Sequence, residues 1–252
     1  MIKSQKPLCD ALGLTADHGL LSIVGGGGKS SLMFALGNLL PGRVLLTTTT
    51  RIFSAQMDIA ERVFTLDDPK WREEIASIAG PSLLVGHVEG EKAVGVPPEL
   101  PGELLKNGQT DWIVLEADGS RMRPTKAPAE HEPVIPHDSS QVVITVGIDA
   151  LSGPIREQTH RPERVSAVTG LSEDATLTPG SLARLMTSAQ GGLKGIPEQA
   201  TVSLLINKVE SDVTKQYAEE IALLALKHSR IRRVIAGKMK PTANSPWTVW
   251  SR

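Results

Sequence analysis

Four consecutive glycines, followed by a lysine and two serines, are the residues whose types and spacing most directly indicate a chemistry. Their order, G-x-x-G-K-S, is a shortened form of the nucleotide-binding phosphate loop G-x-x-x-x-G-K-[ST]. Glycines let backbone amides come close to a phosphate, and a following helix adds the positive end of its dipole. We therefore expect ATP or GTP to bind here with Mg²⁺. The predicted loop residues are Gly25, Gly26, Gly27, Gly28, Lys29, Ser30 and Ser31.

Lys29 and Ser30 carry the most specific expectations within that loop. The Lys29 ammonium is predicted to act on the β- and γ-phosphates, and the Ser30 hydroxyl is predicted to ligate Mg²⁺. A flexible glycine turn with a lysine beside it by chance is the alternative. The position of the loop between an apolar strand and an amphipathic helix favours the nucleotide interpretation.

Polar residues also follow two other predicted strands. Thr49 and Arg51 come after the strand at 44–46, where a hydroxyl and a guanidinium can contact Mg²⁺, a water molecule or the γ-phosphate. Glu116 and Asp118 come after an apolar strand, where P-loop enzymes place a carboxylate that holds Mg²⁺. We predict Asp118 as the metal ligand and Glu116 as the residue that positions water or substrate. An ordinary Asp-Gly turn is the alternative.

Residues 119–138 are rich in prolines and charged side chains, and we predict a long ordered loop at the catalytic end of the sheet. The candidate substrate residues in it are Arg121, Arg123, Lys126, His131 and Glu132. The three basic residues together indicate an anionic second ligand. The neighbouring histidine and glutamate can supply acid–base chemistry. For each residue taken singly, a solvated loop is the alternative.

The sequence Asn207-Lys208-Val209-Glu210 follows another predicted strand. It is similar to the N-K-x-D pattern of guanine-nucleotide proteins, in which the aspartate accepts hydrogen bonds from guanine. Glu210 stands at the aspartate position, so the choice between ATP and GTP stays open. A strand-end turn leading to a helix capped by Ser211 is the alternative. Lys238, after the last predicted strand, lies where such folds make a further base contact.

Apolar runs that alternate with helical patterns predict an α/β fold, namely three P-loop NTPase-like layers with a mostly parallel central sheet. In such sheets ligands bind at the carboxyl ends of the strands. We expect a single nucleotide-binding domain over residues 1–252. Strands are predicted at 20–24, 44–46, 82–85, 112–115, 142–146, 201–206 and 233–236, and helices at 29–40, 69–79, 161–169, 181–189 and 212–227.

The composition narrows the classes of partner and compartment. The chain has 252 residues and a net charge of −1, without the basic excess typical of a nucleic-acid partner. No apolar run reaches the roughly 18 residues that a membrane span needs. The first ten residues lack an apolar signal core, and Cys9 is the single cysteine. We therefore expect a cytoplasmic protein with no nucleic-acid or membrane partner.

Taken together, the motifs resemble those of one family. Their order is GGGGKSS, LLTTTTRI, LEADGSRMRPTKAPAEHEPVIP and LINKVE. The sequence resembles the YqeC-type accessory proteins associated with selenium-dependent molybdenum hydroxylases, and the most specific stretch is Glu116 to Pro133. The resemblance implies a bacterial cytosolic protein with a P-loop and a role in maturing the selenium-containing molybdenum cofactor. The resemblance also implies two kinds of partner. One is the molybdenum cofactor or another anionic small molecule, and the other is a client hydroxylase.

Three functions are compatible with these residues. The first is a Mg²⁺-dependent NTPase that drives a maturation step. The second is an NTP-dependent transferase or ligase acting on the cofactor, for which residues 121–126 would anchor the substrate. The third is a binding module without turnover. Its bound nucleotide would hold a conformation that a client protein recognises. We expect the first.

Overall fold

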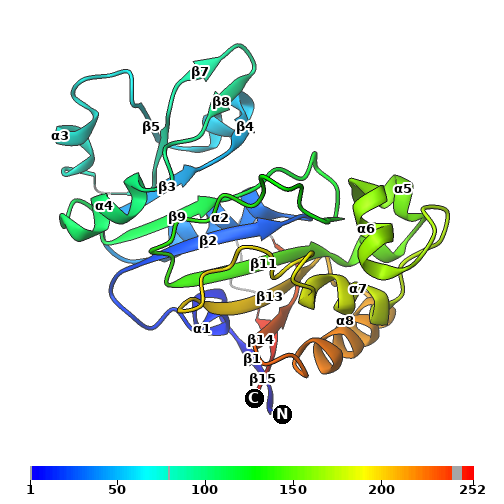
Figure 1. The fold of residues 1–252 in the computed structure, drawn as a ribbon. Helices are drawn as coiled ribbons and strands as arrows, with labels where there is room; N and C mark the ends of the chain where they lie inside the picture. The colour runs from blue at the N-terminus through cyan, green and yellow to red at the C-terminus, as the bar shows by residue number, and fades with distance from the viewer. Residues whose placement is uncertain (1, 79, 240–245) are drawn as a thin grey trace.

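The computed structural model describes residues 2–78, 80–239 and 246–252, and a ten-stranded sheet runs through it (Figure 1). The strands, in their order across the sheet, are β1 (Ile2–Lys6), β15 (Trp247–Ser251), β14 (Ile231–Ala236), β13 (Thr201–Asn207), β11 (Gln141–Gly147), β2 (Gly19–Gly25), β9 (Trp112–Glu116), β3 (Val44–Thr48), β6 (Ser82–Val85) and β5 (Arg62–Thr65). Neighbours from β14 to β5 pair in parallel, whereas β15 is antiparallel to both β14 and β1. The predicted mostly parallel sheet is confirmed.

Helices cover both faces of this sheet. They are α1 (Leu8–Leu12), α2 (Lys29–Leu39), α3 (Trp71–Ile75), α4 (Leu100–Lys106), α5 (Ile155–Gln158), α6 (Pro162–Thr169), α7 (Pro179–Thr187) and α8 (Asp212–Ala225). Along β2, Leu21 and Ile23 belong to the same apolar core as residues of α1 and α2, whereas Leu20 and Val24 belong to the core that the other six helices cover. This alternation creates the predicted three layers, because successive side chains of a strand point to opposite faces. Within the described ranges, no helix combines the length and apolar character needed to cross a bilayer.

Several elements differ from those expected. The helix predicted at 69–79 is the shorter α3, which buries Trp71 and Ile75 one turn apart, and Ala79 lies outside the described residues. The edge strand β1 and its neighbour β15 were not predicted. They pair with each other, so the two chain termini lie side by side (Figure 1). Their stability comes from partners at the opposite end of the chain, which local periodicity does not reveal.

A second, small sheet projects beside the β3–β6–β5 end of the central sheet (Figure 1). Its strands are β4 (Arg51–Phe53), β8 (Lys92–Val94) and β7 (Val88–Glu89). The 3₁₀ helix η1 (Ser54–Ile59) follows β4, and a second one, η2 (Ile148–Leu151), follows β11. Arg51 therefore lies in a strand and opposite Val94, not in a loop.

The predicted long loop at 119–138 is buried in its middle, at residues 124–129, and exposed at 121–123 and 130–131. It contains the short strand β10 (Thr125–Lys126), which pairs in parallel with β12 (Thr159–His160) just before α6. The backbone N–H of Val134 donates to the carbonyl of Ala117, 2.8 Å away, and so ties the far end of the segment to β9. Thr125 and Lys126 are buried. The solvated loop given as the alternative therefore does not describe Lys126 and Glu132, which are buried, whereas Arg121, Arg123 and His131 are exposed.

Candidate functional site

The glycine-rich loop joins β2 to α2, as the sequence predicted. Gly25, Gly27 and Gly28 have φ values of 97°, 72° and 136°, which only glycine adopts readily. A Cβ atom on Gly27 would lie 2.2 Å from the backbone nitrogen of Gly147. The tight turn and the close approach of the chain both require these glycines.

The loop amides fall into two groups. The N–H of Gly26 donates to the Thr145 carbonyl and that of Gly27 to the Arg123 carbonyl, both over 3.0 Å. The backbone N–H groups of Gly28, Lys29 and Ser31 find no acceptor within the described part of the chain. They belong to the first turn of α2, where helical N–H groups have no intrahelical partner. The first group holds the loop in shape, and the second leaves donors for an anion.

Lys29 is buried between the loop and two carboxylates. Its Nζ donates to the Gly25 carbonyl over 2.9 Å. The same Nζ lies 3.4 Å from Asp118 Oδ1 and 4.0 Å from Glu116 Oε2. The ammonium is thus neutralised inside the protein and lies at the end of β2, where the motif requires it.

The two carboxylates have different surroundings. Asp118 accepts hydrogen bonds from the Gly25 N–H at 3.0 and 3.2 Å, and it lies 3.3 Å from the ammonium of Lys126. Burial raises the pKa of Glu116. The charge of Lys29 and a hydrogen bond with the Ser30 side chain act in the opposite direction and lower this pKa, but burial is the larger effect. Glu116 Oε1 is buried and, among the residues that the structure describes, has no hydrogen-bond partner. Asp118 therefore braces the loop, whereas Glu116 offers an open oxygen beside Ser30.

That open oxygen bears on the predicted magnesium site. Mg²⁺ prefers hard oxygen ligands and keeps several waters, so one carboxylate and one hydroxyl are a fitting protein contribution. Glu116 and Ser30 meet that description. This geometry favours Glu116 over Asp118, which was the preferred ligand on sequence grounds. The Thr49 hydroxyl, also predicted as a ligand, donates instead to the Val134 carbonyl over 2.6 Å.

Asn207 holds the other side of the loop. Its Nδ2 donates to the Gly27 carbonyl over 2.8 Å. Its Oδ1 accepts from the backbone N–H of Lys208 at 2.7 Å and of Met239 at 2.9 Å. Asn207 thus connects the ends of β13 and β14 to the phosphate loop. The Glu210 carboxylate pairs with Lys238 Nζ at 2.6 Å.

These residues surround one cavity of about 480 Å³. Its lining consists of the loop residues 27–31, the carboxylates Glu116 and Asp118, the turn 119–122, the small-sheet residues Arg51, Ile52 and Lys92, and the strand-end residues Asn207, Lys208, Lys238 and Met239. Segments as far apart in the sequence as Gly27 and Met239 thus converge at the carboxyl ends of the parallel strands, as expected for this class of fold.

Some predicted site residues do not line that cavity. They are Gly25, Gly26, Thr49, Arg123, Lys126, His131, Glu132 and Glu210. His131 is exposed, and the Arg123 guanidinium donates to the Glu157 carbonyl. Conversely, Ile52, Lys92, Met122 and Met239 line the cavity without having been predicted. No local motif marks them, because tertiary contacts alone bring them to the loop.

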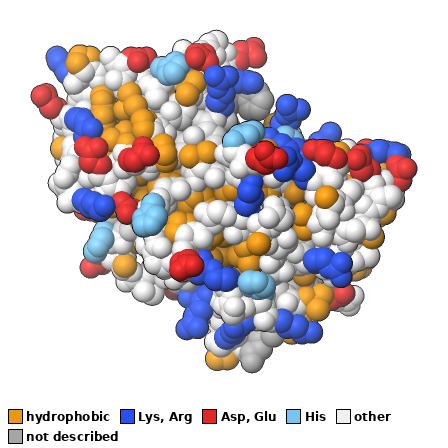
Figure 2. All heavy atoms as spheres, viewed as in Figure 1, with side chains coloured by type: hydrophobic (Ala, Val, Ile, Leu, Met, Phe, Trp, Pro, Cys, Tyr) orange, Lys and Arg blue, Asp and Glu red, His pale blue; other side chains and the backbone are white. Residues whose placement is uncertain are grey.

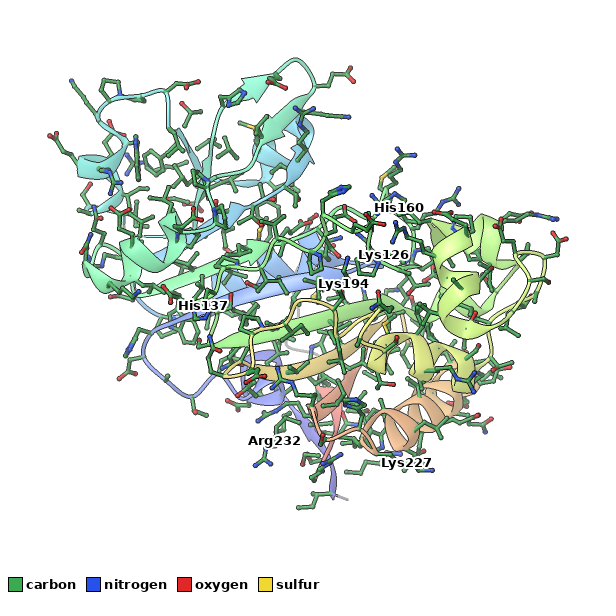
Figure 3. All side chains as sticks on the ribbon, in the orientation of Figure 1. Lys126, His137, His160, Lys194, Lys227 and Arg232 are labelled. Atoms are coloured by element: carbon green, nitrogen blue, oxygen red, sulfur yellow. The ribbon has the colours of Figure 1, made fainter. Side chains whose placement is uncertain are left out.

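Lys126 is the centre of a buried charge network next to the cavity. Its Nζ lies 2.6 Å from Glu132 Oε2 and donates to the Gly119 carbonyl over 2.5 Å. Arg161 donates to the same Glu132 oxygen over 2.7 Å. Figure 3 shows Lys126 and His160 close together on β10 and β12, and charged side chains of both signs gather over this region (Figure 2). Burial and the charges of Arg161 and Lys126 lower the pKa of His160 to about 4.

Glu132 makes the stability of this network depend on pH. Burial opposes its ionisation, but Lys126 and Arg161 outweigh that and lower its pKa from 4.5 to about 2. A carboxylate whose pKa is lower in the folded than in the unfolded protein stabilises the fold at pH values above the unfolded-state pKa. That contribution is lost as the pH falls from 4.5 toward 2. A shift of this size corresponds to a contribution on the order of 3 kcal/mol.

We therefore expect Glu132→Gln to be less stable than the wild type at pH 6, with the difference shrinking steadily below pH 4.5. Urea unfolding of both proteins at a series of pH values measures this directly. Glu130→Gln serves as the control, because the Glu130 side chain is exposed. A difference between wild type and Glu132→Gln that is constant with pH would contradict the assignment.

Comparisons with known proteins agree with the resemblance noted from the motifs. A family profile described as "YqeC protein" matches residues 21–163, which include the glycine-rich loop, both carboxylates and the buried network. The chain is also similar to "Uncharacterized protein YqeC" of Escherichia coli (strain K12), with 36% identity over 216 residues. That alignment covers 81% of this chain and 83% of the relative. This protein is a member of the YqeC family.

Proposed function

We propose that this protein binds ATP or GTP with Mg²⁺ in the cavity at residues 27–31 and hydrolyses it. One observation carries the proposal, namely the glycine-rich loop at the end of β2 with Lys29 buried beneath it and free helix N-terminal donors above. Backbone donors of this kind and a lysine are what a nucleotide phosphate requires. Six cationic side chains and two carboxylates line the cavity, so its charge favours a polyanion.

The residues divide the work of binding among them. Lys29 would transfer its contact from the two carboxylates to the β- and γ-phosphates, and Asn207 would keep the loop in place. Glu116 and Ser30 would hold Mg²⁺, which neutralises phosphate charge when bound. The second oxygen of Glu116 would orient the attacking water. Asp118 contacts the Gly25 N–H and Lys126 and would keep the glycine-rich loop in position relative to Lys29 and Glu116.

The biological role follows from the resemblance of the motifs. Nucleotide hydrolysis would drive a step in the maturation of the molybdenum cofactor of a hydroxylase, with that cofactor and the client enzyme as partners. The electrostatic character of the cavity is compatible with such an anionic ligand.

Thermal unfolding with Mg²⁺ and ATP, with Mg²⁺ and GTP, and with Mg²⁺ alone tests the proposal. Ligand at about a hundred times its dissociation constant contributes roughly 2.7 kcal/mol. For a chain of this size that is an increase of about 5–11 °C in Tm. The nucleotide that gives the increase identifies the base, and phosphate release then measures hydrolysis. No increase with either nucleotide would refute the proposal.

A further inference from the structure

The cavity has two ends, and the strand order places them on opposite sides of β2. Asn207 and Lys238 follow β13 and β14 on one side. The turn 119–122, which follows β9, lies on the other side, together with Lys92 of β8 in the small sheet. The proposed nucleotide accounts for the phosphate loop and for the Asn207 side. Lys92 and the turn 119–122 have no role in that account.

Cationic side chains from three separate segments converge on this second end. Arg51 comes from β4, Lys92 from β8 and Arg121 from the turn after β9. Arg51 pairs with Glu89 across the small sheet, 3.2 Å apart. Among the residues that the structure describes, Lys92 and Arg121 have no carboxylate partner. Two unneutralised cations at one end of a cavity attract an anion.

The turn that carries Arg121 is held in an unfavourable conformation. Arg121 and Met122 have φ values of 47° and 59°, in the left-handed region that side chains other than glycine rarely adopt. The turn is fixed at its base, where the Arg123 N–H donates to Ser120 over 2.9 Å. Met122 is 87% exposed although it lines the cavity. Backbone strain of this kind is concentrated at ligand sites, and an exposed methionine offers an apolar contact.

We infer that this end of the cavity binds a second small molecule, a phosphate monoester with an apolar part. Lys92 and Arg121 bind the phosphate, and Met122 and Ile52 contact the apolar part. A phosphate dianion matches two cations in charge, and the planar guanidinium matches its oxygens in geometry. The site lies beside the γ-phosphate end of the proposed nucleotide site and rests on that proposed function.

Phenyl phosphate is a suitable probe, because it combines a phosphate dianion with an apolar ring. It is titrated calorimetrically into the full chain saturated with Mg²⁺ and a non-hydrolysable nucleotide, so that the phosphate loop is filled. The double variant Lys92→Gln/Arg121→Gln should bind it at least about tenfold more weakly, since each charge-assisted hydrogen bond is a strong one. The matched control is Lys227→Gln/Arg232→Gln, two exposed cations remote from the site (Figure 3). This control should bind phenyl phosphate as the wild type does.

Met122→Ser tests the apolar contact. The wild type should prefer phenyl phosphate to inorganic phosphate, and the variant should lose most of that preference while still binding both anions. An unchanged preference would remove Met122 from the site. It would also contradict the apolar part of the inferred ligand.

Three results would overturn the inference. The first is no binding of phenyl phosphate, or equal binding by wild type and Lys92→Gln/Arg121→Gln. The second is a loss of nucleotide affinity alone in that double variant, which would assign both cations to the nucleotide. The third result concerns a wild type that binds no nucleotide. The proposed function then fails, and the titration with phenyl phosphate is run without nucleotide. Binding of phenyl phosphate that depends on Lys29, and not on Lys92 and Arg121, would then place the anion on the phosphate loop.

Discussion

Replacement of Lys29 by methionine should abolish the stabilisation of this protein by nucleotide. Lys29 supplies the ammonium that the phosphates require, and methionine retains much of its length without the charge. The increase of about 5–11 °C in Tm expected for the wild type at saturating nucleotide should therefore fall to near zero. Phosphate release should fall to background in the same variant. Thermal unfolding with and without Mg²⁺ and nucleotide measures the first effect.

The same substitution also changes the protein without nucleotide. Lys29 is the nearest cation to Glu116, whose pKa burial already raises. Its loss should raise that pKa further, so that Glu116 is protonated at a higher pH. The variant should then become less stable as the pH rises, because a carboxylate without its cation is costly to bury.

Lys227→Met is the matched control for Lys29→Met. Lys227 is exposed and lies after α8, far from the loop (Figure 3). It should keep both the stabilisation by nucleotide and the stability of the wild type. Retention of the full nucleotide effect in Lys29→Met would contradict the assignment of the loop.

The second large effect is expected at Lys126. Its replacement should lower the free energy of unfolding more than the replacement of an exposed lysine does. Its side chain is 1% exposed and lies beside both Asp118 and Glu132. Lys126→Met would remove the cation that two buried carboxylates share and would leave Asp118 with Lys29 and Glu132 with Arg161, a loss of about 3–5 kcal/mol. In Tm this corresponds to a decrease of about 6–20 °C. Thermal and urea unfolding at pH 7 measure it.

Lys106→Met separates burial from charge pairing as the cause. Lys106 also pairs with a carboxylate, at 2.9 Å from Asp138, but its side chain is 70% exposed. An exposed pair contributes at most about 1 kcal/mol. Similar losses in the two variants would show that the network of Lys126 is no more important than a surface ion pair.

The network also explains how residues 119–138 affect the loop. Lys126 contacts Asp118, and Asp118 accepts from the Gly25 N–H. Glu132 and Arg161 hold Lys126 from the opposite side. Changes at Glu132 therefore reach the phosphate loop through three consecutive polar contacts. Of the residues predicted as substrate contacts, Lys126 and Glu132 thus support the loop, whereas Arg51 and Arg121 line the cavity.

Local sequence patterns determined the parallel sheet, the glycine-rich loop between β2 and α2 and the position of its lysine. Gly25 to Ser31 can be identified from sequence because the turn, the helix start and the lysine are all specified by neighbouring residues. The carboxylates Glu116 and Asp118 were also located, since they follow an apolar strand directly. These features depend on residues within about one strand or one helical turn of each other.

Only the tertiary structure decided what each of these side chains contacts. Asp118 and Gly25 are 93 positions apart, and their hydrogen bond separates the role of Asp118 from that of Glu116. Lys126 and Glu132 carry charges typical of an exposed loop, yet strand pairing between β10 and β12 buries them. Lys92 belongs to no motif and reaches the cavity because β8 pairs with β4. Burial and partner choice depend on contacts between distant segments, which composition and periodicity do not encode.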